Sequence, residues 1–185
     1  MVSGFGTLRR RDAYFAIRMA SRAVLKRADF RIVHISLEYE HIHLIVEADD
    51  DRALSKGIQA FESSAAQHLN RITSRGRGPV FAERYHVVFL RSPTQARYAI
   101  AYVLGNWRHH LQDQGDGEER SWDLDYFSSA VSFDGWQELA AGAVLQYAIP
   151  VDMRLCVSRP KTWLLRIGWT KAGSISMYTV PGKRR

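Results

Sequence analysis

The stretch Glu38-Tyr-Glu-His-Ile-His-Leu-Ile-Val-Glu47 alternates polar and apolar side chains and is rich in β-branched residues toward its end. This alternation has the period of a β-strand, in which successive side chains point to opposite faces of a sheet. His41 and His43, called the His pair below, therefore project side by side from one face. The residues on the other face are Ile42, Leu44, Val46 and Ala48. Two adjacent imidazoles form either half of a metal site or an ordinary hydrogen-bonded pair, and the strand alone leaves both open.

Hydrophobic periodicity predicts a helix before this strand and a hairpin around it. Apolar residues at helical spacing extend over residues 8–28, interleaved with arginine and lysine. The next stretch, Phe30–Glu38, is rich in β-branched residues and is separated from the His pair only by Tyr39-Glu40. We therefore expect the two strands to pair as an antiparallel hairpin with a tight turn.

Further along the chain, the sequence predicts a helix, a third strand and another helix. Asp49-Asp-Asp51 provides capping carboxylates for an apolar-periodic segment that runs to Ile72. The β-prone stretch Tyr85–Arg91 predicts a strand, and Thr94 is the expected cap of a helix over residues 95–111. This order of elements predicts an α+β fold, with helices packed on an antiparallel sheet.

Composition divides the chain and restricts its class. A polar, Gly-containing loop from residue 112 predicts a core domain, residues 1–111, and a C-terminal appendage, residues 112–185, that packs on the core and ends in a basic tail. No apolar run approaches the roughly 18 residues of a membrane helix, so we expect a cytoplasmic protein with no membrane partner. The net charge of +7 favours a polyanionic partner such as nucleic acid. The single cysteine, Cys156, excludes an internal disulfide.

Polar side chains recur every four residues in the predicted 95–111 helix. They lie along one face of it and are Tyr98, Tyr102, Asn106 and His110. If this face covers the His pair, the Asn106 amide oxygen can be a third metal ligand and the Tyr102 hydroxyl can reach a substrate on the ion. We prefer Tyr102 to Tyr98 as the reactive phenol because only Tyr102 has a ligand-type side chain four residues later. The alternative is a helix surface without chemistry.

Together these motifs resemble the HUH endonucleases that have one catalytic tyrosine, specifically the bacterial REP-associated tyrosine transposases. The matching segments are His41-Ile-His43, Gly78–His86 and Tyr102-Val-Leu-Gly-Asn106, and the similarity extends to residues 122–129 and 133–136. The resemblance implies a ferredoxin-like or RRM-like fold and a DNA transposase that nicks and joins single-stranded or hairpin DNA.

The resemblance also assigns roles to individual residues. It implies that His41, His43 and Asn106 hold Mg²⁺ or Mn²⁺, although zinc also suits this ligand set. It implies that Tyr102 attacks the phosphorus of the scissile phosphate and forms a 5′-phosphotyrosine intermediate.

Six arginines are candidate DNA-binding residues. Arg75 and Arg77 lie on a Gly-flanked loop that suits contact with a DNA backbone. The others are either phosphate contacts or solvated surface charges, and they are Arg84, Arg91, Arg97 and Arg108. His34 and His86, in the neighbouring predicted strands, either flank the site or have structural roles.

The sequence departs from the family pattern in two places. Family members usually carry a strand before the first helix, so we expect a sheet that lacks this first strand and has an exposed edge. Trp107 follows Asn106 where family members often have proline.

The alternative function is a non-catalytic module that binds single-stranded nucleic acid, and an inert remnant is the third hypothesis. We expect a nucleoid-associated monomer or homodimer.

Overall fold

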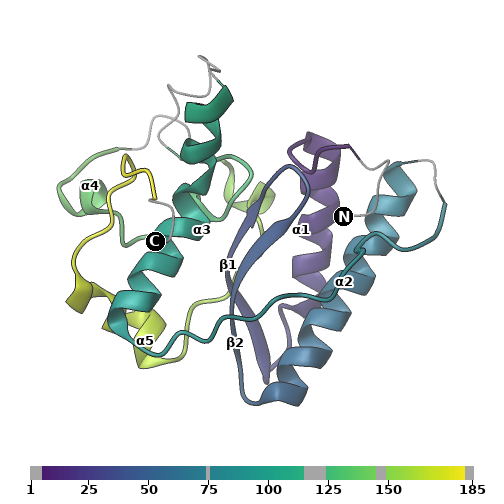
Figure 1. The fold of residues 1–185 in the computed structure, drawn as a ribbon, viewed down its shortest axis with the longest axis horizontal. Helices are drawn as coiled ribbons and strands as arrows, with labels where there is room; N and C mark the ends of the chain where they lie inside the picture. The colour runs from purple at the N-terminus through teal and green to yellow at the C-terminus, as the bar shows by residue number, and fades with distance from the viewer. Residues whose placement is uncertain (1–5, 74–75, 115–123, 145–148, 182–185) are drawn as a thin grey trace.

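The structure, a computed structural model, describes residues 6–73, 76–114, 124–144 and 149–181. Within these ranges the sheet has two antiparallel strands, β1 (Phe30–Leu37) and β2 (Ile42–Ala48). Helices α1 (Arg11–Val24) and α2 (Asp51–Ile72) pack on one face of the sheet, and α3 (Pro93–Gln114) packs on the other (Figure 1). The fold is therefore α+β, with helices packed on an antiparallel sheet, as the sequence predicts, and the helices cover both faces of the hairpin.

Each face of the sheet has its own hydrophobic core. The core on the α1 and α2 side includes Tyr14, Phe30 and Phe61, and the apolar face of β2 packs against it. The core on the α3 side includes Ile45, Ile100 and Trp136. The alternation of the His strand is confirmed, because Ile42, Leu44 and Val46 belong to the first core and Ile45 to the second.

A register shift between Ile32 and His34 interrupts the pairing of β1 with β2. The extra residue, Val33, lies in the core beside α3, and His34 is paired with Ile45 of that same core. A bulge of this kind lets two consecutive residues of one strand serve the same face.

The helices begin where capping side chains meet them. Asp50 accepts a hydrogen bond from the Ala53 N–H at 2.6 Å, which confirms the cap predicted for α2. The prediction that Thr94 caps α3 is wrong, since α3 begins at Pro93 and the Ser92 hydroxyl accepts from the Gln95 N–H at 3.2 Å. Proline suits the first helical position because its missing N–H would have no partner there. None of the described helices is both long enough and apolar enough to cross a membrane.

The predicted strand Tyr85–Arg91 is also wrong. The segment that joins α2 to α3 has no secondary structure between residues 79 and 91, and residues 82–89 are exposed. A strand needs a neighbour that takes up its backbone hydrogen bonds, and in the described part of the chain the sheet ends at β2. The β-propensity of Tyr85–Arg91 therefore does not by itself make this segment a strand.

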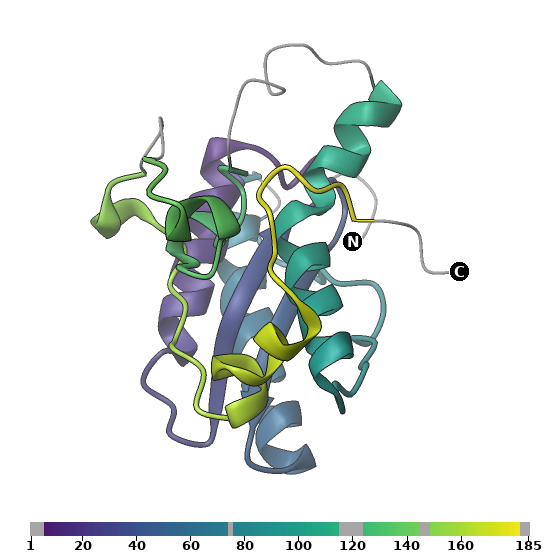
Figure 2. The same ribbon diagram turned by 90° about the vertical axis from the view of Figure 1, so that its left-hand side faces the viewer.

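The C-terminal residues pack on the core through short elements and loops (Figure 2). These elements are η2 (Ala130–Ser132), α4 (Gln137–Ala140), η3 (Val151–Met153), α5 (Trp163–Arg166) and η4 (Gly168–Ala172). Along the edge of β1 that faces away from β2, the N–H groups of Ser129 and Ser158 donate to the carbonyls of Ile35 and Ile32, both at 2.8 Å. Trp136 and Trp169 complete the core beside α3. The domain division at residue 111 stays a prediction.

Candidate active site

The hairpin and α3 bring the His pair and Tyr102 together. The imidazole centroids of His41 and His43 are 4.8 Å apart with their planes at 85°, and the Tyr102 ring centroid lies 5.2 Å from that of His43. Ser36 of β1 is the cross-strand partner of His43. These positions follow from the strand period, which points His43 toward the face that α3 covers, and from the helical period, which points Tyr102 back toward the sheet.

Asn106 lies one helical turn after Tyr102 and is only 4% exposed, whereas Tyr102 is 40% exposed. The Asn106 amide is therefore buried, whereas the Tyr102 phenol remains accessible to a substrate. Trp107, the residue after Asn106, is buried, and α3 continues through it without interruption.

Two imidazoles and an amide oxygen form a donor set that suits a divalent cation. Imidazole nitrogen and amide oxygen bind Mn²⁺ and Zn²⁺ readily, and Mg²⁺ prefers oxygen and keeps several waters. Among the described residues, no three His, Cys, Asp or Glu side chains converge on one point. The His pair and Asn106 are the residues that the sequence predicts as metal ligands, and this donor set would leave further positions of a bound ion open to phosphate and water.

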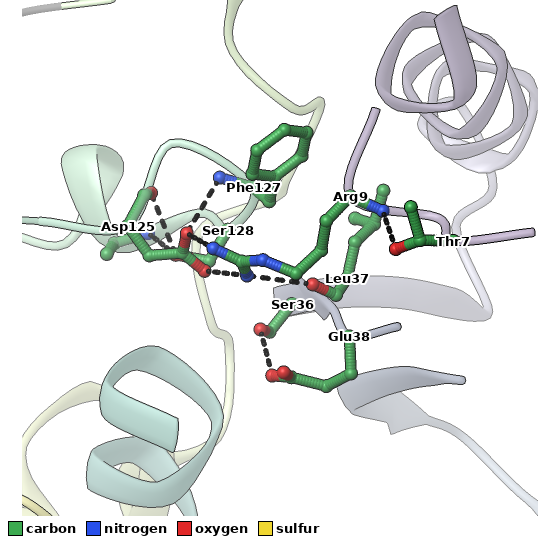
Figure 3. Close-up of polar contacts among 9 residues, drawn as sticks. Thr7, Arg9, Ser36, Leu37, Glu38, Asp125, Phe127 and Ser128 are labelled. Atoms are coloured by element: carbon green, nitrogen blue, oxygen red, sulfur yellow. Dashed lines mark hydrogen bonds and ion pairs between the residues drawn. The ribbon is translucent and has the colours of Figure 1, made fainter. Parts of the chain in front are cut away.

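A buried carboxylate beside the His pair was not predicted. Glu38 is 1% exposed, its N–H donates to the His41 carbonyl at 2.9 Å, and its carboxylate accepts from the Ser36 hydroxyl at 2.9 Å (Figure 3). Ser36 is in turn opposite His43. The signal in the sequence was the spacing Glu-x-x-His across a two-residue turn, which places Glu38 opposite His41 in a tight hairpin.

A buried ion pair joins the start of the chain to the C-terminal region next to Glu38. The Arg9 guanidinium donates to both oxygens of Asp125, at 2.8 and 3.1 Å, and also to the Leu37 carbonyl at 3.1 Å (Figure 3). Burial raises the pKa of the Asp125 carboxyl above its usual range, although the positive charge of Arg9 opposes this effect. The negative charge of Glu38 also raises the pKa of Asp125, so the two carboxylates interact electrostatically.

The predicted DNA-binding arginines divide into accessible and engaged side chains. Arg97 donates to the Ser174 carbonyl at 3.0 and 2.6 Å, and Arg108 donates to the Met177 carbonyl at 2.9 Å. These two therefore hold the C-terminal segment against α3. Arg84 and Arg91 are exposed, and their side chains make no hydrogen bond or ion pair within the described ranges.

The Gly-flanked loop after α2 carries Arg77, while Arg75 lies outside the described residues. Gly76 and Gly78 have φ values of +70° and +123°, a backbone region that favours glycine. The loop turns sharply there and leaves Arg77 exposed at a pocket of about 350 Å³ that Arg71 also lines. This part of the surface is basic and open, as contact with a phosphate backbone requires.

The remaining candidates lie apart from the reactive groups. His34 is buried against the Phe133 ring, with centroids 5.4 Å apart, and burial lowers the pKa of His34 to about 4. His86 is exposed on the segment between α2 and α3. Tyr98 is 63% exposed on α3, one turn before Tyr102. Of these two tyrosines, it is Tyr102 whose ring contacts the His pair.

A comparison with protein families identifies the class. Residues 8–105, more than half of the chain, match the family described as "Transposase IS200 like", and the chain belongs to this family. The matched region contains the His pair and Tyr102 and ends one residue before Asn106. Membership makes the protein a transposase-type, DNA-binding and DNA-processing enzyme. Neither a curated protein nor a solved structure shows significant similarity to the chain.

Proposed function

We propose that this protein cleaves and rejoins single-stranded DNA with Tyr102 as the nucleophile and a divalent metal, Mg²⁺ or Mn²⁺, held by His41, His43 and Asn106. The observation that carries the proposal is the approach of the Tyr102 ring to His43, at 5.2 Å between centroids, across the interface of α3 and β2. A metal ion would neutralise charge on the scissile phosphate and act as a Lewis acid.

The chain's own residues supply the covalent step. The Tyr102 oxygen attacks the phosphorus, the bond between phosphorus and the 3′ oxygen breaks, and the phenol proton is lost while the 3′ oxygen gains one. The products are a 5′-phosphotyrosyl link and a free 3′-hydroxyl. Because a phenol is a better leaving group than an alkoxide, a 3′-hydroxyl can later reverse the attack and join strands without ATP.

Basic residues outside the reactive centre would position the strand. Arg77 on the loop after α2 and Arg84 and Arg91 on the segment before α3 are exposed and free to contact phosphates. Arg97 and Arg108 are engaged with the C-terminal segment, so their contribution to DNA binding would be indirect.

A covalent-labelling assay tests the proposal. A hairpin-bearing single strand labelled at its 3′ end is incubated with the protein and Mn²⁺, and the products are separated under denaturing conditions. We expect labelled protein with the unaltered chain and none with Tyr102→Phe, because phenylalanine lacks the attacking oxygen. The matched control is Tyr98→Phe, one turn earlier on α3, which should label normally. Equal labelling of Tyr102→Phe would refute the assignment, and DNA binding without any labelling would indicate a non-catalytic module.

A further inference from the structure

The pocket of about 350 Å³ at the end of α2 lies away from the reactive groups. The last turns of α2 and residues 76–78 of the following loop form its walls. A Cβ atom built on Gly76 or Gly78 would meet nothing within 4 Å, so the loop leaves the pocket open on its side. Because α2 and α3 pack on opposite faces of the sheet (Figure 1), the pocket is separate from Tyr102, and the covalent step uses none of its side chains.

Two arginines make this pocket positive. Arg71 and Arg77 both line it, and both are exposed. Neither side chain makes a hydrogen bond or an ion pair within the described ranges. No acidic side chain belongs to the described residues that line the pocket. The planar guanidinium group matches the oxygens of a phosphate, so an anionic group is the ligand that these two side chains favour.

Asn70 adds a hydrogen-bond acceptor to the same pocket. It lines the pocket, is 5% exposed, and its Nδ2 group donates to the Gly78 carbonyl at 2.8 Å. That bond fixes the orientation of the amide. The buried Oδ1 atom then makes no hydrogen bond in the described part of the chain. A buried acceptor without a partner is costly, so Asn70 favours a ligand that brings an N–H group.

A nucleotide combines the two groups that the pocket favours. Its phosphate can meet the arginines, while an amino group of its base can donate to the Asn70 Oδ1 atom. A phosphate ion alone would satisfy the arginines, but it would fill little of the pocket and leave the amide oxygen unsatisfied. Adenine, cytosine and guanine carry an exocyclic amino group, whereas thymine does not.

We infer that this pocket binds one nucleotide, with its phosphate on Arg71 and Arg77 and the amino group of its base on Asn70. The nucleotide is either free or part of a DNA strand, since both present the same phosphate and base. Binding requires neither Tyr102 nor a metal ion. The inference can therefore fail while the proposed cleavage function holds, and the reverse is also true.

Calorimetry without divalent metal tests the inference, with dAMP, dTMP and inorganic phosphate as the probes. We expect saturable binding of dAMP, at least about fivefold tighter than that of dTMP or phosphate, because only dAMP satisfies the buried amide oxygen. Arg71→Gln with Arg77→Gln should lower the dAMP affinity at least about tenfold. The matched control is Arg52→Gln, which changes an exposed arginine in the first turn of α2 and should leave the affinity unchanged.

A second variant tests the role of the amide. Asn70→Leu should remove the preference for dAMP over dTMP, with a melting temperature measured alongside. If this variant fails to fold, the exposed arginine variants decide the test. Failure of dAMP to bind, equal affinities for dAMP and dTMP, or undiminished binding to Arg71→Gln with Arg77→Gln would overturn the inference.

Competition then distinguishes the two sources of the nucleotide. A single-stranded oligonucleotide of mixed sequence is added at saturating concentration to the complex with dAMP. Displacement of dAMP shows that the pocket receives a nucleotide of a DNA strand. Undisturbed dAMP binding shows that the pocket receives a free nucleotide.

Discussion

At the residue scale, Glu38 places a buried negative charge beside the His pair. The Glu38 carboxylate accepts from Ser36, and its backbone N–H is bonded to the His41 carbonyl. In such a position an acidic group attracts a cation and orients the residues that bind it. Glu38→Gln keeps the size of the side chain and an oxygen for the Ser36 hydroxyl, but it removes the charge. Under the proposed function, we expect Mn²⁺ affinity, measured by calorimetry, to fall by about tenfold.

The control for this experiment is Glu40→Gln. Glu40 lies in the same turn and is exposed, so its charge is screened by water and its loss should change Mn²⁺ affinity far less. Equal affinities for the unaltered chain and Glu38→Gln would show that Glu38 serves only the hairpin.

At the scale of elements, the contact between α2 and β1 depends on the absence of a side chain at Gly57. A Cβ atom built there would lie 2.2 Å from the ring of Phe30, which is itself fully buried and has no room to move. We expect Gly57→Ala to lower the free energy of unfolding, measured with urea, by about 1–3 kcal/mol despite the better helix propensity of alanine.

Gly105 in α3 provides the matched helical control. A Cβ atom there would meet its nearest neighbour, Pro181, at 3.4 Å, which is an ordinary contact. Gly105→Ala is therefore expected to leave stability unchanged or to raise it by up to about 1 kcal/mol. If both glycine variants change the free energy of unfolding alike, the close packing of α2 on Phe30 does not determine the effect of substituting Gly57.

The elements also show where sequence information ends. Local patterns predicted the β1–β2 hairpin, the helices and the shared face of Tyr102 and Asn106, because these depend on spacing within one element. The strand predicted at Tyr85–Arg91 is absent because a strand needs a pairing neighbour, which local propensity does not reveal. Likewise, Arg97 and Arg108 donate to the carbonyls of Ser174 and Met177, which lie 77 and 69 residues further along the chain, and no local signal marks such pairs.

At the scale of the whole molecule, the sheet is held between two helical layers, and the layer beside α3 encloses polar groups as well as apolar ones. Glu47 of β2 accepts from Arg31 and from the backbone N–H groups of Lys161 and Thr162, which fixes the C-terminal segment to the sheet. Burial on its own raises the pKa of the Glu47 carboxyl, but these hydrogen bonds outweigh it and lower the pKa below the usual value. His34 lies in the same layer, and burial is what shifts its pKa. The stability of the whole fold should therefore respond to acid.

Burial lowers the pKa of His34 from 6.5 to about 4, so the folded protein keeps this imidazole neutral. Below pH 6.5 the unfolded chain binds a proton that the folded chain does not bind until about pH 4. The free energy of unfolding should therefore decrease as the pH falls through this window, with a contribution from His34 of about 3 kcal/mol. Urea unfolding at pH 7 and at pH 4.5 measures the decrease. His34→Leu should make it smaller, whereas His86→Gln, which removes an exposed imidazole, should leave it unchanged; an equal decrease in His34→Leu would assign the acid sensitivity to other groups.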